Sequence, residues 1–366
     1  MNLRERDAMW MGMAINLARK GKGRTAPNPC VGAVIVKNEK IIGQGWHKKA
    51  GWPHAEVVAL GSCKTSPKGA TLYVTLEPCN HHGKTGPCAV AITGAGIKKV
   101  VIGSRDTSPK KGSRGIGRLR RGGVKVRTGV LKKECDSLIT DFIKHSSTGM
   151  PLVTLKTAIT LDGKISTETG DSRWISSELS RRLVHRMRNE MDAVMIGAGT
   201  AVEDDPMLTC RFGRSRRDPL RVIVDGDLKI PITSKIIGSA RSVPTLIATT
   251  RKAKISRIEE TKKRGANVMV SPGGRGKVNL GWLMSELGKR NVMSVLLEGA
   301  GGLAGSAVDA GIVDRVMFFI APKIVGGSRS AITGFAVKKM AEALEVKNVV
   351  INQIGPDLLI EGDIIK

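Results

Sequence analysis

Four residues in the N-terminal third have the types and spacing of a catalytic metal site. His54 and Glu56 stand at the predicted start of a helix, and Cys79 and Cys88 each follow a proline. One imidazole and two thiolates would give Zn²⁺ three protein ligands and leave a fourth position for water, as in catalytic zinc sites. The metal would lower the pKa of that water, and Glu56 would pass its proton to leaving ammonia. The pattern therefore predicts hydrolytic removal of an amino group.

This layout resembles the cytidine-deaminase pattern H-x-E…P-C-x-x-C, with one departure. Eight residues, NHHGKTGP, separate Cys79 from Cys88, where the pattern has two. The structural alternative is that His54 caps a helix and that the cysteines are small buried side chains. A strand predicted between the two halves of the motif favours the zinc site.

The elements that must position these residues alternate between strands and helices, which predicts an α/β architecture. The expected elements of the first half are helices over 5–20, from 54 and from 88, and strands over 30–36, 41–46, 70–77, 98–104 and 124–130. The first two strands read as a hairpin that turns at 37–40. The polar stretch 144–151, which ends in Gly and Pro, is the predicted linker.

A second α/β pattern follows the linker. It contains a helix over 177–189, for which Ser176 or Ser177 is the expected cap. Its strand-like runs lie over 152–159, 192–199, 220–226, 244–250, 267–270, 292–299 and 315–322.

The longer spacing between the cysteines narrows the resemblance to one family. TLYVTLEPCNHHGKTGPC, APNPCVGAVIV and GWHKKAGWPHAE resemble the deaminase domain of the bifunctional riboflavin-biosynthesis deaminase–reductases. LKTAITLDGKISTETGDSRWISS, VMIGAGTAVEDDPMLTCR, VLLEGAGGLAGSAVDAG and APKIVGG resemble the reductase domain of that family. The resemblance implies a cytidine-deaminase-like α/β/α domain over 1–146 and a dihydrofolate-reductase-like α/β domain over 147–366.

Two consecutive reactions are implied by the resemblance. The first is zinc-dependent deamination of 2,5-diamino-6-(5-phosphoribosylamino)pyrimidin-4(3H)-one. The second is NADPH-dependent reduction of the ribosyl group of 5-amino-6-(5-phosphoribosylamino)uracil to a ribityl chain. The implied cofactors are Zn²⁺ and NADPH, and the implied partners are a small-molecule substrate and at least one further copy of the chain, with no nucleic acid and no membrane.

Further site residues carry over from the family by position. For the deaminase, those expected to contact the base and the phosphoribosyl arm are Asn28, His47, His81, Lys84 and Asp106. For the reductase, those expected to hold the substrate are Ser172, Arg188, Leu208, Arg211 and Glu298. Those expected to line the cofactor are Ala158, Trp174, Thr200, Asp204, Gly226, Ala300, Gly301, Gly302, Leu303, Ala304, Gly305 and Ser306. Lys156 and Asp204 are the candidates for polarising or protonating the ribose.

The residue types suit these roles. Asn28 can read a pyrimidinone edge with both a donor and an acceptor. Lys84 can meet a phosphate as a point charge, and Arg188 and Arg211 can grip one from two sides.

The glycine-rich run over 299–306 follows a strand and opens a predicted helix, where backbone amides can approach a diphosphate. Ala300 stands where the family typically has a second glycine. Arg251, which follows the strand over 244–250, is a hypothesis for contact with the 2′-phosphate of NADPH.

The net charge of +28 raises the alternative of a deaminase that acts on a nucleic-acid base, such as one in tRNA. Aromatic residues make up only 3% of the chain, so stacking platforms are scarce, and a general lysine and arginine bias is favoured. A relative with one active domain is a second alternative, although the main motifs of both domains are present. Six scattered cysteines, short apolar runs and a charged N-terminus favour the cytoplasm.

Overall fold

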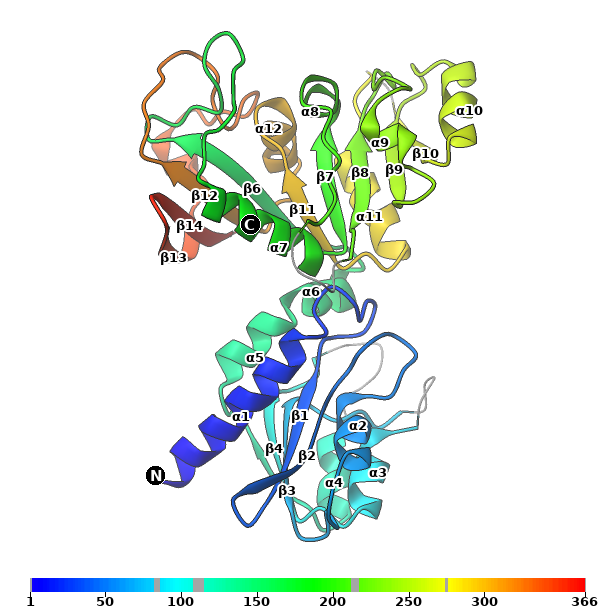
Figure 1. Cartoon of the computed structure of the whole chain (residues 1–366), viewed down its shortest axis with the longest axis vertical. Helices are drawn as coiled ribbons and strands as arrows, with labels where there is room; N and C mark the ends of the chain where they lie inside the picture. The colour runs from blue at the N-terminus through cyan, green and yellow to red at the C-terminus, as the bar shows by residue number, and fades with distance from the viewer. Residues whose placement is uncertain (1, 82–85, 108–114, 212–216, 274–275, 366) are drawn as a thin grey trace. The chain divides into compact units, whose positions relative to one another are not determined.

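The structure, a computed structural model, describes residues 2–81, 86–107, 115–211, 217–273 and 276–365. It divides into two compact units, residues 1–149 and residues 150–366 (Figure 1), each with hydrophobic clusters of its own. Among the described residues, the helices all fall short of the length and apolar character that a membrane crossing demands.

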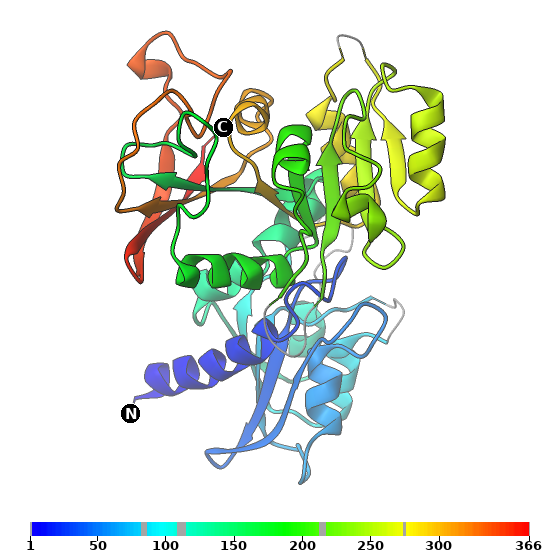
Figure 2. The ribbon, with the colours of Figure 1, turned by 45° about the horizontal axis from the view of Figure 1, so that its top comes forward.

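The first unit is an α/β/α sandwich around a five-stranded sheet in the order β2-β1-β3-β4-β5. Its strands are β1 (Gly32–Lys37), β2 (Lys40–Trp46), β3 (Thr71–Leu76), β4 (Lys99–Ser104) and β5 (Lys125–Thr128). Its helices are α1 (Leu3–Arg19), α2 (Ala55–Gly61), α3 (Cys88–Gly94), α4 (Gly115–Arg121), α5 (Lys132–Leu138) and α6 (Thr140–Thr148). Helices α1 and α5 cover one face, and α2, α3 and α4 cover the other (Figures 1 and 2).

The hairpin of β1 and β2 forms where the sequence predicts it. Lys37 pairs with Lys40, so the loop consists of Asn38 and Glu39 alone. Both loop residues have positive φ, 49° and 59°, as in the mirror-image turns whose twist matches a hairpin. Strand β3 pairs antiparallel with β1 and parallel with β4, so β3 joins the hairpin to the parallel part of the sheet.

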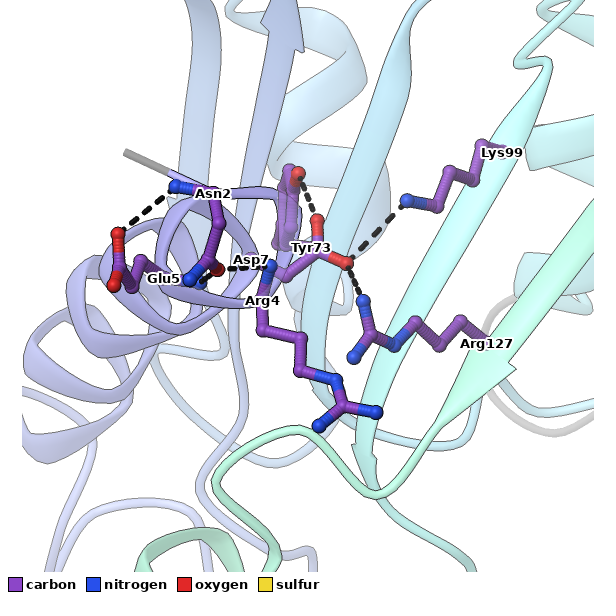
Figure 3. Close-up of polar contacts among 7 residues, drawn as sticks. All are labelled: Asn2, Arg4, Glu5, Asp7, Tyr73, Lys99 and Arg127. Atoms are coloured by element: carbon purple, nitrogen blue, oxygen red, sulfur yellow. Dashed lines mark hydrogen bonds and ion pairs between the residues drawn. The ribbon is translucent and has the colours of Figure 1, made fainter.

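Helix α1 is fixed to the sheet by a buried carboxylate, Asp7, which is 1% exposed (Figure 3). Tyr73 on β3 donates its hydroxyl to Asp7 Oδ1 at 2.7 Å. Arg127 on β5 and Lys99 on β4 approach Asp7 Oδ2 at 2.6 and 3.4 Å. Two cations and a hydroxyl compensate the buried charge, so the contact joins α1 to three neighbouring strands.

The second unit is built on a nine-stranded sheet in the order β10-β9-β8-β7-β11-β6-β12-β14-β13. The strands from β10 to β12 in this order are parallel, and β14 and β13 continue the sheet antiparallel. The strands are β6 (Leu152–Thr160), β7 (Ala193–Gly197), β8 (Leu220–Val224), β9 (Thr245–Thr249), β10 (Asn267–Val270), β11 (Ser294–Glu298), β12 (Arg315–Ala321), β13 (Val346–Ile354) and β14 (Asp357–Ile364).

Helices cover both faces of this parallel sheet, as the apolar character of its central strands requires. On β11, Leu297 packs in one cluster with Leu283 of α11, and Leu296 packs in another with Val184 of α7. The helices are α7 (Glu178–Glu190), α8 (Ala198–Glu203), α9 (Lys235–Gly238), α10 (Ile255–Lys263), α11 (Leu280–Lys289) and α12 (Gly302–Asp309), with a 3₁₀ turn η1 (Met340–Glu342).

The structure adds two features that the sequence did not predict. The stretch 144–151, predicted as a linker, contains the boundary between the two units, but it is helical up to Thr148, and α6 ends at Gly149 with a φ of 72°. The glycine that suggested a linker is thus the left-handed residue that ends a helix. The C-terminal hairpin of β13 and β14 was not predicted at all.

Candidate active sites

In the first unit, one imidazole and two thiols converge from three elements. His54 precedes α2 as its N-cap, Cys79 follows β3, and Cys88 is the first residue of α3. His54 Nδ1 lies 3.2 Å from Cys88 Sγ and 3.5 Å from Cys79 Sγ. Their three candidate ligand atoms all lie within 4.8 Å of one another. A nitrogen and two sulfurs this close together fit Zn²⁺ with a position left open.

The surroundings of the Cys79 sulfur favour its thiolate form. Hydrogen bonds from the Cys88 thiol and from His54 lower the pKa of Cys79 to about 4, although its burial opposes this. The backbone N–H of Cys88 also donates to Cys79 Sγ at 3.4 Å. The side-chain contact with Cys79 and burial raise the pKa of the Cys88 thiol, so the two sulfurs share one proton, which a bound metal would displace.

Glu56 lies in the first turn of α2 and is 3% exposed. Its burial raises the pKa of the carboxyl group above its ordinary value, and the charge of His54 opposes this rise. A carboxyl group with a raised pKa beside the ligands can both accept and return a proton.

A second histidine connects the metal ligands to Asn28. The ring of His47 lies at 84° to that of His54, with centroids 5.3 Å apart. Its Nδ1 is 3.2 Å from the Pro53 carbonyl oxygen, and its Nε2 is 3.1 Å from Asn28 Nδ2. Burial lowers the pKa of His47, so the neutral ring donates from Nδ1 and accepts at Nε2. This tautomer determines which way the Asn28 amide is turned.

The other predicted deaminase residues lie at the same edge of the sheet. Leu76 and Ser104 are partners on the parallel strands β3 and β4. His81 follows the first of these strands and Asp106 the second, so both leave the sheet at its carboxyl edge, as Cys79 does. Lys84 lies outside the described residues.

In the second unit, most of the predicted reductase residues lie at the ends of parallel strands or in the segments that follow them. Ser172 and Trp174 lie between β6 and α7, and Ala158 lies on β6. The others at the carboxyl edge follow β7, β8 and β11, and they are Thr200, Asp204, Leu208, Arg211, Gly226 and the run from Ala300 to Ser306. Ligands of open parallel α/β sheets bind at this edge, so the placement fits a cofactor site.

A bidentate ion pair joins α7 to β11 at this edge. Arg188 Nε and Nη2 donate to the two carboxylate oxygens of Glu298 at 2.5 and 2.6 Å, and Arg188 Nη1 donates to the Thr209 carbonyl at 3.3 Å. The two side chains are only 13% and 11% exposed. Pairs of this planar geometry are among the stronger charge-assisted contacts in proteins.

Lys156 is the partner of Glu298 across the parallel strands β6 and β11. Its Nζ lies 5.4 Å from the centroid of the Phe319 ring. Burial lowers the pKa of Lys156, and the carboxylate of Glu298 opposes this shift. In the same unit, burial raises the pKa of Asp204, against the charge of Arg173. Both candidates for proton donation are therefore shifted towards their neutral forms.

The glycine-rich run opens α12 as predicted. Gly301 has a φ of 63° and donates its N–H to the Ala331 carbonyl at 2.8 Å. A Cβ added at Gly302 would meet no described atom within 4 Å, whereas a Cβ added at Gly305 would lie 1.9 Å from the Thr333 carbonyl oxygen. Gly305 is therefore needed for packing, and the backbone N–H groups at the start of α12 are of the kind that bind a diphosphate.

Comparison with known proteins assigns both units. Residues 151–360 match the family model of the RibD C-terminal domain, and residues 4–104 match that of the zinc-binding region of cytidine and deoxycytidylate deaminases. The riboflavin biosynthesis protein RibD of Aquifex aeolicus is 41% identical over 358 residues, which cover 98% of each chain. That of Escherichia coli is 36% identical over 367 residues, covering 96% of this chain and 98% of the other. The chain belongs to the RibD family.

Solved structures of the RibD family extend the match to the whole fold. The diaminohydroxyphosphoribosylaminopyrimidine deaminase/5-amino-6-(5-phosphoribosylamino)uracil reductase of Thermotoga maritima superposes with a TM-score of 0.87 at 36% identity, covering 100% of both chains. RibD of Acinetobacter baumannii gives 0.87 at 33% identity, covering 99% of this chain and 100% of the other. The riboflavin biosynthesis reductase Rib7 of Saccharomyces cerevisiae, at 19% identity and 0.50, covers 63% of this chain and 99% of its own, and shares the fold.

As a member of the RibD family, the chain is a riboflavin-biosynthesis enzyme with a zinc-dependent deaminase unit and an NADPH-dependent reductase unit. The predicted fold classes, the two activities and the two cofactors are confirmed.

Sequence reasoning missed residues that hold the RibD sites in place. Glu77 Oε1 accepts a hydrogen bond from the Ile116 N–H at 3.1 Å, and a Cβ on Gly115 would lie 1.8 Å from the Pro78 carbonyl oxygen. Helix α4 thus supports the segment that carries Cys79. In the second unit, His185 Nδ1 accepts from the Arg211 N–H at 3.4 Å. Of these residues, Glu77 could have been noticed in the sequence, because it is a carboxylate placed between a strand and a metal-ligand motif.

Proposed function

We propose that residues 1–146 deaminate 2,5-diamino-6-(5-phosphoribosylamino)pyrimidin-4(3H)-one, and that residues 147–366 reduce the ribosyl group of the uracil product to a ribityl chain. The convergence of His54, Cys79 and Cys88 beside buried Glu56, on a chain that also carries the Arg188–Glu298 site, supports this proposal most strongly.

In the proposed deamination, His54, Cys79 and Cys88 hold the zinc ion, which supplies a Lewis acid that makes water nucleophilic near neutral pH. Glu56 accepts the proton of the attacking water and returns it to the departing amino group. Asn28, turned by His47, offers its amide to the edge of the pyrimidinone ring. His81, Lys84 and Asp106 are proposed to meet the phosphoribosyl arm.

In the proposed reduction, the glycine-rich start of α12 would hold the diphosphate of NADPH, which would supply the hydride. Arg188 and Arg211 hold the substrate phosphate, and Glu298 keeps the Arg188 guanidinium in position. Lys156 or Asp204 delivers the proton that the ring-opened ribose oxygen needs. A lowered pKa makes the Lys156 ammonium the stronger acid, and a raised pKa favours the protonated Asp204 carboxyl group. The remaining predicted residues, Ser172 and Leu208 for the substrate and Ala158, Trp174, Thr200 and Gly226 for the cofactor, complete the proposed pocket. Arg251 stays a hypothesis for the 2′-phosphate.

A two-step assay tests the proposal. Purified protein given the diaminopyrimidinone should release ammonia, and the product should then oxidise NADPH. Removing zinc with a chelator should stop ammonia release and leave NADPH oxidation of the preformed uracil intermediate unchanged. Ammonia release that survives full zinc removal, or NADPH oxidation that is lost with the zinc while the fold is intact, would contradict it.

The alternative of a tRNA base deaminase is not favoured, because residues 151–360 match a reductase domain that such an enzyme does not need. The cytoplasmic location stays a prediction from the sequence.

We also propose that the enzyme is at least a dimer and that β13 contributes to the interface. Strand β13 is the last strand of the sheet, and Val349, Val350 and Ile351 on it are 51%, 52% and 63% exposed. A long apolar edge of this kind pairs readily with another chain. Light scattering should show a dimer or larger assembly that Val350→Lys shifts to monomer. A monomeric wild-type protein, or an assembly unaffected by the variant, would overturn this.

A further inference from the structure

A fully buried arginine, Arg221, contacts the segment that carries two of the predicted reductase residues. Arg221 is on the apolar strand β8 and is 0% exposed. Within the described chain, its hydrogen-bond partners are carbonyls and hydroxyls rather than carboxylates. They are Thr245 Oγ1, Ser239 Oγ and the carbonyl oxygens of Met207, Ile236 and Val243, at 2.6 to 3.2 Å.

A buried cation without a contacting carboxylate is costly unless its donors are satisfied. Burial lowers the pKa of Arg221 to about 10, so the guanidinium stays charged at neutral pH. Its planar fork can reach several acceptors at once, which an ammonium group cannot do with the same geometry. The partners belong to three segments: the loop 204–208, helix α9 with its C-cap Ser239, and the start of β9.

The loop 204–208 is the segment of these three that carries predicted site residues. Asp204 is expected to contact the cofactor and Leu208 the substrate. The Leu208 side chain is 3% exposed and packs in the core with Ile223, so Leu208 would contact the substrate through its backbone. Asp205 and Leu208 have φ values of 39° and 52°, a left-handed conformation that non-glycine residues adopt only when other contacts enforce it.

Several contacts hold this loop, among them a hydrogen bond from Arg173 Nη2 to the Asp204 carbonyl at 3.4 Å. Arg221 Nη1 donates to the Met207 carbonyl at 3.2 Å, and Asp205 Oδ1 accepts from the Lys235 N–H at the start of α9 at 2.8 Å. Arg221 also donates from Nη2 to the Ile236 carbonyl of α9 at 3.0 Å. The same guanidinium therefore holds the loop and the helix to which the loop is tied.

We propose that Arg221 is a positioning residue for the reductase, holding the loop 204–208 in the conformation that presents Asp204 and Leu208 to cofactor and substrate. The inference rests on the proposed function for those two roles. A purely stabilising role would lower the stability of the unit, whereas a positioning role predicts that the loss of Arg221 weakens the binding of NADPH or of the intermediate through the loop 204–208.

Three substitutions separate the two roles. Arg221→Lys keeps a charge and loses the planar guanidinium, and Asp205→Ala removes the contacts of the loop with Lys235 at the start of α9. Thr245→Val is the matched control, because it removes a hydroxyl partner of Arg221 on the β9 side and leaves the Met207 contact in place. Each variant is prepared as the full chain.

Steady-state reduction of the uracil intermediate is the first measurement. We expect Arg221→Lys and Asp205→Ala each to raise the KM for NADPH or for the intermediate by about tenfold, with kcat changed far less. Thr245→Val should leave both KM values unchanged, even where it lowers thermal stability. Deamination by the same protein samples should be unaffected.

Hydrogen exchange of the peptide that spans 204–210 is the second measurement, and it does not depend on activity. Faster exchange is expected in Arg221→Lys and Asp205→Ala but not in Thr245→Val. The proposal is overturned if exchange and KM are unchanged in the first two variants, or if Thr245→Val shifts them equally. If Arg221→Lys does not fold, the comparison of KM and hydrogen exchange between Asp205→Ala and Thr245→Val tests the proposal in its place. A wild-type protein that does not reduce the intermediate would refute the proposed function alone, and the exchange result would still decide the role of Arg221.

Discussion

The zinc site and the reductase site are assembled over different distances along the chain. His54 and Cys88, which meet at the zinc site, are 34 positions apart, and Glu56 is two residues after the first ligand. Arg188 and Glu298, which meet at the reductase site, are 110 positions apart and come from a helix and a central strand. A site made from short-range motifs can be predicted from the spacing of its residues in the sequence. A site made from long-range contacts can be recognised only once the sheet shows which segments lie together. Damage to either site should therefore leave the other working.

The largest expected effect comes from removing a zinc ligand. Cys88→Ala should lose bound zinc, and deamination should fall by roughly 10⁴-fold or more, because the metal makes the nucleophile. Glu56→Gln should keep the zinc and slow deamination by about 10²–10⁴-fold, as expected for loss of a general acid–base group. Elemental analysis and ammonia release measure these two outcomes.

Cys63→Ala is the matched control for the zinc ligand, since Cys63 is a half-buried cysteine outside the cluster. It should keep both zinc and activity. NADPH oxidation of the preformed intermediate should be normal in all three variants. Its loss in Cys88→Ala would show that the reductase site depends on the zinc site.

Next in size is the effect of breaking the Arg188–Glu298 pair. Glu298→Gln leaves the buried guanidinium without its carboxylate, so the free energy of unfolding of the second unit should fall by about 3–5 kcal/mol. Reduction should be lost while ammonia release continues. Urea unfolding followed together with both activities measures this.

Glu286→Gln is the control, because Glu286 forms ion pairs with Lys289 and Arg290 at the surface of α11. Surface pairs contribute little, so its unfolding midpoint should match the wild type. Equal effects of the two substitutions would show that the long-range pair is not what holds the reductase site.

The same pair gives a pH dependence. Burial alone would raise the pKa of Glu298, but Arg188 and then Lys156 bring it below its ordinary value of 4.5. A carboxyl group with a lowered folded-state pKa stabilises the protein above 4.5, and that stability is lost as the pH falls through the folded pKa. The second unit should therefore lose stability below pH 4.5, with a smaller slope in Glu298→Gln. Urea midpoints on both sides of pH 4.5 measure the slope, and equal slopes would remove Glu298 as the cause.

The smallest effect concerns the start of α7, the helix that carries Arg188. The Ser177 side chain accepts from the Ser180 N–H at 3.3 Å, so Ser177→Ala should cost about 1 kcal/mol of the second unit's stability. Ser176→Ala, one position before the cap, is the matched control and should change nothing. Both should leave deamination intact, and thermal unfolding distinguishes them.

Much of the fold followed from local pattern. The hairpin of β1 and β2, the capped helix α7 and the glycine-rich start of α12 lie where alternation, capping and glycine predicted them. The polar stretch 144–151 contains the boundary between the two units, but its helical conformation was missed, because polar residues also suit an exposed helix such as α6. Strand β13 was missed since nearly all its residues are exposed, so burial leaves no alternation to detect.

The sites divide in the same way. The zinc cluster could be predicted because each ligand type and its spacing carry chemistry of their own. The neutral tautomer of His47 and the pairing of Arg188 with Glu298 could not, because they depend on which segments the sheet brings together. Arg221 looked like a single charge in an apolar strand, and only the packing of three segments around it suggests a role.

The exposed edge of β13 has a consequence for association when it is combined with the charge of the chain. Two copies that meet there each carry a net charge of +28, so they repel one another over long distances. Dissolved ions shorten that repulsion to about 10 Å at 0.1 M, whereas the apolar contact at the edge is little weakened by them. Assembly should therefore tighten as ionic strength rises, the opposite of what a protein held to a polyanion would show.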